Sequence, residues 1–451
     1  MLDRIVRHRA FGWIYMPLLF VAACLVVWYN REVDGVIGFV LIASVMLVVS
    51  SRLTDAMYPV MLLAVFVTRC YDSADTFLAR AWVAVPAVAA ILFHFLYYRK
   101  PIRVGRSFWG LCAVAVAVTL GGVGTISASE YFAPTALFYV FGLGGGMVAF
   151  YLLARSHLDS DSAREIAKIL YIVGILACLC VLRFYMEDWE WVMKKHRFAR
   201  FQSSNNLATF LMLALPFPLY FAKKRYVDIL AVFFMYACLF LTGSRGGILM
   251  GTVELILVLA SFAVAQWKRP VNCVLCSASL IAFVAVVAHF LSKTMASMEI
   301  SPSLNGLEAL FETITGLFVY EGESRLQLLS RVKSDFATNP VFGVGIGYTG
   351  NADIYSPVKG AMNWYHMWTA QIVGGLGVVG ILAYGYQLVE RIIIFFRSRS
   401  FINLTLFLSY GGLFLMSQVN PGEFCPVPYA MLAVTYFILM EKEIAPKEIQ
   451  S

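Results

Sequence analysis

The chain has 451 residues, of which 60% are hydrophobic and only 14% are charged, and its formal net charge is +8. A soluble domain of this length cannot bury so much apolar surface, so the composition excludes a soluble globular protein and predicts an integral membrane protein with many crossings. No cleavable signal peptide is expected, because Arg4, Arg7 and Arg9 precede an apolar segment that no small-residue cleavage site follows.

Apolar segments of membrane-spanning length follow one another along most of the chain. At roughly 20 residues per crossing, they predict about fourteen helices in a single integral membrane domain covering residues 1–451. The expected spans are residues 11–29, 34–50, 55–70, 81–98, 108–127, 131–154, 166–185, 205–222, 227–241, 247–266, 271–291, 366–388, 402–418 and 427–440. Several are short enough to be re-entrant, so the expected fold class is an all-α polytopic membrane protein with about 12–14 transmembrane helices.

The basic residues between these spans predict their orientation. With the N-terminus in the cytoplasm, most Lys and Arg residues fall in loops on that side, as the positive-inside rule requires. Both termini are then cytoplasmic. The two basic loops that break the rule, residues 186–204 and 292–365, are expected outside the cytoplasm.

A glycine-rich hinge joins the spans 227–241 and 247–266. Residues 242–247 read Thr-Gly-Ser-Arg-Gly-Gly and place Arg245 at a membrane boundary. A guanidinium in such a turn suits an anionic group such as phosphate. The alternative is an ordinary connecting turn with a snorkelling arginine.

A helix is expected inside the long loop, after Ser324 and before Asn339–Pro340. Spacings of i, i+4, i+7 and i+11 predict one buried face, headed by an arginine. That face comprises Arg325, Leu329, Val332 and Phe336. The following run at Gly343, Gly345 and Gly347 is expected to form a turn, and without a flanking strand it is weak evidence for a nucleotide site.

Four charged or titratable groups in separate segments are expected at one extracytoplasmic face. They are Arg197, Arg245, Arg325 and His366. Three arginines without a nearby cluster of acids would attract anions, and the imidazole could accept a proton near pH 7. For Arg197 and its neighbour Arg200, contact with solvent or lipid headgroups is the alternative. For His366 the alternative is a polar anchor at the interface.

In this order, the segments resemble the O-antigen ligase and polymerase superfamily. Arg197 stands nine residues before Asn206 in RFARFQSSNNLA, and TGSRGG matches the family's Ser-Arg-Gly-Gly turn at Arg245. Arg325 opens a helix before FGVGIG, and His366 precedes a glycine-rich span. The resemblance covers roughly residues 190–390. It departs from the family's usual Pro-Asn and His-Asn pairs, at Asn205–Asn206 and at His366–Met367.

The resemblance implies a GT-C-type membrane glycosyltransferase of the bacterial cytoplasmic membrane, with one long extracytoplasmic loop that contains short helices. It implies a donor glycan on undecaprenyl pyrophosphate, a glycan or lipid-linked acceptor, and inverting transfer without metal, cofactor or nucleic acid. His366 would be the general base and Arg245 a catalytic arginine. The pyrophosphate ligands would be Arg197, Arg245 and Arg325, with Arg200 as a further candidate. A chain-length regulator is a conceivable partner.

Three other functions compete with this interpretation. An O-antigen ligase transferring to lipid A core belongs to the same superfamily, although YHMWTAQIVGGLGVVG resembles the polymerase members more closely. A lipid-linked oligosaccharide flippase would also need a basic cavity, but its charges are expected within spans near the midplane. A cell-wall polymerase of the shape and division type lacks the SRGG turn.

Overall fold

The computed structural model describes most of the predicted spans. The described residues are 9–69, 80–126, 133, 136–159, 161–187, 204–222, 227–265, 274, 277–278, 281, 322–348, 364–398, 400–420 and 422–448. Every predicted span coincides with helical residues except 271–291, most of which lies outside this part of the chain. The described residues contain helices and no strands, so the all-α prediction is confirmed.

Helices follow one another in chain order with short connections. The α-helices are α2 (Arg9–Trp28), α3 (Glu32–Val49), α4 (Leu53–Arg69), α6 (Ala84–Tyr97), α7 (Arg106–Ile126), α8 (Ala136–Phe141), α9 (Met147–His157), α10 (Ser162–Glu187), α12 (Ser204–Ala214), α13 (Phe217–Ala222), α14 (Val227–Leu241), α15 (Arg245–Ala265), α18 (Gly322–Thr338), α20 (Trp368–Arg397), α21 (Phe401–Ser417) and α22 (Met431–Glu448). Shorter turns of helix are η1 (Ala81–Val83), η3 (Gly142–Gly146), η4 (Gly422–Phe424) and η5 (Pro426–Ala430).

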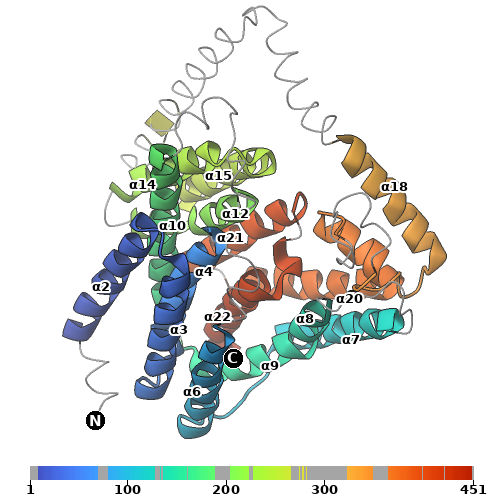
Figure 1. Ribbon diagram of the computed structural model, residues 1–451, viewed down its shortest axis with the longest axis horizontal. Helices are drawn as coiled ribbons and strands as arrows, with labels where there is room; N and C mark the ends of the chain where they lie inside the picture. Colours follow the sequence, from blue (N-terminus) through green and yellow to red (C-terminus); the bar gives the residue numbers. More distant parts are fainter. Residues whose placement is uncertain are drawn as a thin grey trace, which may run out of the picture.

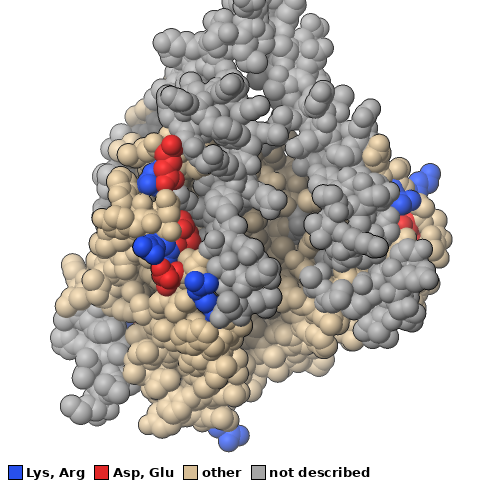
Figure 2. All heavy atoms as spheres, in the orientation of Figure 1, with Lys and Arg blue, Asp and Glu red and all other residues tan. Residues whose placement is uncertain are grey.

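Six of the described helical segments are long and apolar enough to cross a membrane. These are Glu32–Val49, Ala136–His157, Ser162–Glu187, Ser204–Ala222, Gly246–Ala265 and Trp368–Arg397. Shorter apolar helices lie between them, and charged side chains occupy only a few places on the described part of the face in Figure 2. Length and composition therefore support a multi-pass membrane protein, because a helix satisfies its own backbone hydrogen bonds in lipid.

The helices of the candidate site occupy the C-terminal half of the fold. Helix α20 packs against α7, α18 and α22, while α21 packs against α12 and α15 (Figure 1). Helix α18 lies beside α20 at the edge of the molecule opposite to α2 and α3. This arrangement places α21 and its following turn between the α12–α15 pair and α20.

Helix α20 is broken inside the predicted span 366–388. Gly377 has a φ of +59°, a conformation that glycine adopts readily. The ring centroids of Trp368 and Tyr384 are 5.3 Å apart. The intervening stretch of a straight helix would rise on the order of 24 Å. The first part of α20 therefore folds back toward the second.

The turn after α18 supplies the hydrogen bonds that the break in α20 would otherwise leave open. In a continuous helix, the amides of residues 378 and 379 would donate to the carbonyls of residues 374 and 375. All four groups instead bond to residues 340–345. The bonds are Val378 N to Pro340 O at 2.8 Å, Val379 N to Val341 O at 3.1 Å, Val344 N to Gly374 O at 3.0 Å and Gly345 N to Gly375 O at 3.0 Å. The glycine-rich run thus forms a backbone lock with the glycines of α20.

Candidate active site

The Arg245 turn is built by standard helix-end chemistry. Gly243 has a φ of +67° and ends α14, as glycine commonly does at this position. The buried Ser244 hydroxyl accepts a hydrogen bond from Gly247 N at 3.2 Å and caps α15. Arg245 is therefore the first residue of α15. Its side chain lies outside the described part of the chain.

The same turn is tied to the start of α12. The Ser244 hydroxyl donates to Asn205 Oδ1 at 2.6 Å. A side chain at Gly247 would come within 2.7 Å of Ala208 Cβ, so glycine permits close approach of the two helices. The structure thus brings together two segments that the sequence predicted at one face, the Asn205–Asn206 pair and the SRGG turn.

The face of α18 differs from the prediction at one position. Leu328 and Val332 are buried, but Leu329 is 45% exposed. Asp335 is also buried, so the packed stripe follows positions 328, 332 and 335. Arg325 still belongs to this stripe, three residues before Leu328, although its side chain is not described. The prediction that Leu329 lies on the packed face was wrong.

His366 lies in the short turn that leads into α20. Its φ is +52°, which is uncommon for a residue with a side chain. The neighbouring Tyr365 is buried and donates from its hydroxyl to Asp335 Oδ2 at 2.5 Å. Its backbone amide donates to Gln371 Oε1 at 3.2 Å. Helix α18, which carries Arg325, is therefore fastened directly to the residue before His366.

Residues 418–430, which we term the α21–α22 connector, join the Arg245 turn to the His366 turn. Gln418 accepts a hydrogen bond from Thr369 Oγ1 at 2.6 Å. The next residue, Val419, fills the space beside Gly246, where an added Cβ would lie 2.6 Å from Val419 Cγ2. Two consecutive residues thus contact the segments that hold the predicted base and the predicted arginine.

The connector also contacts the remaining motif segment. Tyr429 donates to Asn206 Oδ1 at 3.3 Å, and the Phe424 ring lies 6.3 Å from the Trp364 ring between centroids. Sequence reasoning missed this segment. The available signal was Glu423, an acidic residue between two apolar spans, since ionisable groups at such depth are rarely incidental.

Two predicted site residues cannot be placed by the structure. Arg197 and Arg200 both fall in residues 188–203, outside the described part of the chain. Their proximity to Arg245 and His366 therefore stays a prediction.

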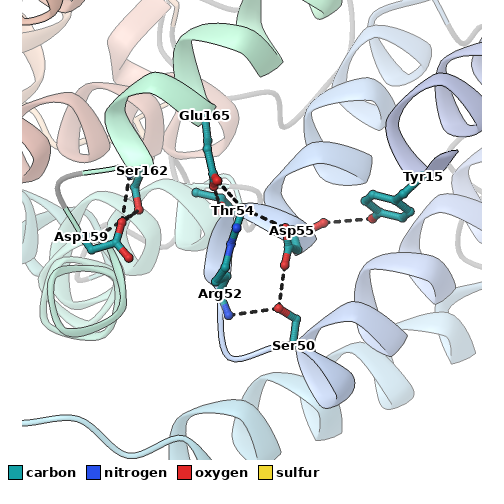
Figure 3. Close-up of polar contacts among 8 residues, drawn as sticks. All are labelled: Tyr15, Ser50, Arg52, Thr54, Asp55, Asp159, Ser162 and Glu165. Carbon is teal, nitrogen blue, oxygen red and sulfur yellow. Dashed lines mark hydrogen bonds and ion pairs between the residues drawn. The ribbon is translucent and has the colours of Figure 1, made fainter. Parts of the chain in front are cut away.

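Other polar clusters among the described residues have internal partners. In Figure 3, Arg52 pairs with Glu165, and Thr54 donates to the same carboxylate at 2.5 Å. Ser50 donates to Asp55 at 2.6 Å, which fastens the α3–α4 turn. These satisfied contacts join α4 to α10 and leave no group directed at a ligand. The described residues also include no group of three or more metal-ligating side chains.

A comparison with known families decides the class of this site. Residues 230–385 match the family model described as "O-Antigen ligase". The chain carries an O-antigen ligase domain. The domain includes Arg245, Arg325 and His366, whereas Arg197, Arg200 and the α21–α22 connector lie outside the matched residues. No curated protein matches the chain.

The O-antigen ligase domain makes the chain a membrane enzyme of the ligase and polymerase type, which acts on lipid-linked glycans. The predicted resemblance over residues 190–390 is confirmed at the level of the family.

Proposed function

We propose that this enzyme is a polysaccharide polymerase of the O-antigen, capsule or exopolysaccharide type. It would move a glycan from undecaprenyl pyrophosphate to an acceptor sugar hydroxyl at the extracytoplasmic face of the bacterial cytoplasmic membrane. The observation that carries the proposal is the contact of Gln418 with Thr369 and of Val419 with Gly246. These contacts set the His366 turn and the Arg245 turn beside one short connector, within reach of one substrate.

The proposed chemistry divides between the arginines and the histidine. His366 takes the proton from the acceptor hydroxyl, whose oxygen attacks the anomeric carbon. The bond from that carbon to the pyrophosphate oxygen breaks on the opposite side, so the configuration inverts. Arg245 and Arg325, with Arg197 and Arg200 as the candidates in the basic loop, would stabilise the charge on the pyrophosphate as it leaves. This route requires neither a metal nor ATP.

A ligase that transfers finished polysaccharide to lipid A core is the second candidate. Its support is the description of the matching family model, which names the ligase reaction. The polymerase is favoured by the resemblance of YHMWTAQIVGGLGVVG to polymerase members and by Met367 in place of the family's asparagine. A polymerase would also be the candidate to work with a chain-length regulator.

Purified enzyme and a lipid-linked repeat unit separate these functions. A polymerase should convert the repeat unit into a ladder of longer lipid-linked chains without ATP. Transfer that occurs only when lipid A core is added would instead establish the ligase. Movement of intact donor across the vesicle membrane, without a change of bonds, would establish a flippase.

Arg245→Lys tests the proposed pyrophosphate contact. Lysine keeps the positive charge but loses the bidentate geometry of the guanidinium. Losing one charge-assisted hydrogen bond should lower kcat/KM by about 10- to 100-fold in a glycan transfer assay. Arg31→Lys is the matched control, because the Arg31 side chain is 72% exposed and lies 3.6 Å from Asp34. Equal activity of the two variants would remove Arg245 from the site.

A further inference from the structure

A buried ion pair anchors the α21–α22 connector. Glu423, in η4, pairs with Arg391 of α20, and both residues are at most 4% exposed. The Arg391 Nη1 group also donates to the Tyr410 hydroxyl at 2.7 Å. The guanidinium lies over the rings of Tyr410 and Phe437, at 4.9 Å and 5.1 Å from the centroids. The pair therefore joins the connector to α20, α21 and α22.

The charge of Glu423 is what holds this carboxylate in place. Its second oxygen, Oε2, is buried and has no hydrogen-bond partner among the described residues. Removing two charges from water costs several kcal/mol per ion, so a buried pair is weak evidence for stability alone. Intramembrane ionisable groups are more often retained for function. We therefore examine what the anchored connector does.

The connector holds the His366 turn on both sides. Phe424, the residue after Glu423, contacts the Trp364 ring, and Gln418 bonds to Thr369. These contacts fall two residues before and three residues after His366. A positive φ in a residue other than glycine costs on the order of 1–3 kcal/mol and persists only where the surroundings fix it. The connector supplies part of that restraint.

We propose that Glu423, held by Arg391, is a positioning residue for His366. It acts through the connector and is not assigned a contact with substrate. Loss of the ion pair would loosen the contacts at Trp364 and Thr369, and His366 would leave the orientation needed for proton transfer. The inference rests on the proposed function, in which His366 is the base.

Glu423→Gln is the first test, because it removes the charge and nearly preserves the shape. Misplacement of a catalytic group by about 1 Å can cost on the order of 10²-fold, so kcat should fall by about 10- to 100-fold while KM for the lipid-linked donor stays unchanged. Glu441→Gln is the matched control. Glu441 forms a buried pair with Arg155 at 2.7 Å, near the other end of α22. This variant should lose stability but retain the kcat of the folded enzyme.

A second variant covers the case in which Glu423→Gln does not fold. Gln418→Ala removes the bond to Thr369 and leaves the ion pair intact, so it should also lower kcat without raising KM. Equal kcat in Gln418→Ala and the wild type would overturn the positioning role of the connector. So would equal losses of kcat in Glu423→Gln and Glu441→Gln.

A labelling experiment separates this inference from the proposed function. His366→Cys places a thiol at the turn, and its reaction with a membrane-impermeant maleimide is followed by mass spectrometry of the peptide that carries position 366. Adding Glu423→Gln should change the labelling rate, whereas adding Glu441→Gln should leave it unchanged. If the wild-type protein transfers no glycan, the proposed function fails and the labelling still decides. An unchanged rate with Glu423→Gln would refute the positioning role.

Discussion

His366→Ala should lower glycan transfer by about 10²- to 10⁴-fold, the usual contribution of a general base. Alanine cannot accept the proton of the acceptor hydroxyl, while the pyrophosphate-binding groups remain. KM for the donor should therefore change little, and the loss should appear in kcat. The measurement is polymer formation by purified enzyme from a lipid-linked repeat unit. Near-normal transfer by well-expressed His366→Ala would exclude His366 as the base.

The backbone at His366 requires a second variant as a control. Its φ of +52° is unfavourable for alanine, so His366→Ala could lose activity through the backbone alone. Asparagine tolerates a positive φ better than most residues but has no group that accepts the proton. His366→Asn should therefore fold like the wild type and be as inactive as His366→Ala. High activity in His366→Asn would show that the turn, and not the imidazole, is needed.

Helix positions could be predicted from the sequence because the bilayer allows few alternatives. A lipid-exposed backbone must satisfy its own hydrogen bonds, so each apolar segment of sufficient length becomes a helix. The helix after Ser324 was also predicted, and it ends at Thr338, immediately before Asn339–Pro340. The expected face was wrong at Leu329 because two leucines stand side by side in this helix. Periodicity alone cannot decide which of two such neighbours packs inward.

The break in α20 could not be predicted, because its cause lies in another segment. Gly374, Gly375 and Gly377 were noted only as a glycine-rich span, and residues 343–347 only as a turn. Their hydrogen bonds to one another join positions about thirty residues apart, which no local pattern indicates. The glycine run therefore serves a backbone lock, a role that its G-x-G-x-G spacing did not suggest.

The candidate site was predicted in its parts but not in its connection. The order of Arg245, Arg325 and His366 led to the correct family, and Ser244 and Asn205 meet as two segments of one face. The α21–α22 connector was missed because its contacts to Thr369 and Gly246 depend on three-dimensional packing. Once the fold is known, a single buried carboxylate, Glu423, becomes the most informative residue outside the family motifs.

Gly377→Ala should strongly destabilise the enzyme, because the backbone lock has no room for a side chain. An added Cβ would lie 2.5 Å from Pro340 O and 2.6 Å from Gly343 N, and the φ of +59° is unfavourable for alanine. Backbone strain and overpacking each cost about 1–3 kcal/mol, so the variant should lose about 2–4 kcal/mol of stability. Thermal unfolding of the detergent-solubilised protein measures this loss.

Gly385→Ala is the matched control for the lock, since it lies further along α20 and has nothing within 4 Å of an added Cβ. Alanine is favoured over glycine in a helix by up to about 1 kcal/mol, so this variant should be as stable as the wild type or slightly more so. Gly377→Ala should also reduce activity in the molecules that remain folded. The lock joins the turn after α18 to α20, and these helices carry Arg325 and follow His366. Equal melting temperatures for the two variants would show that the break in α20 does not depend on this glycine.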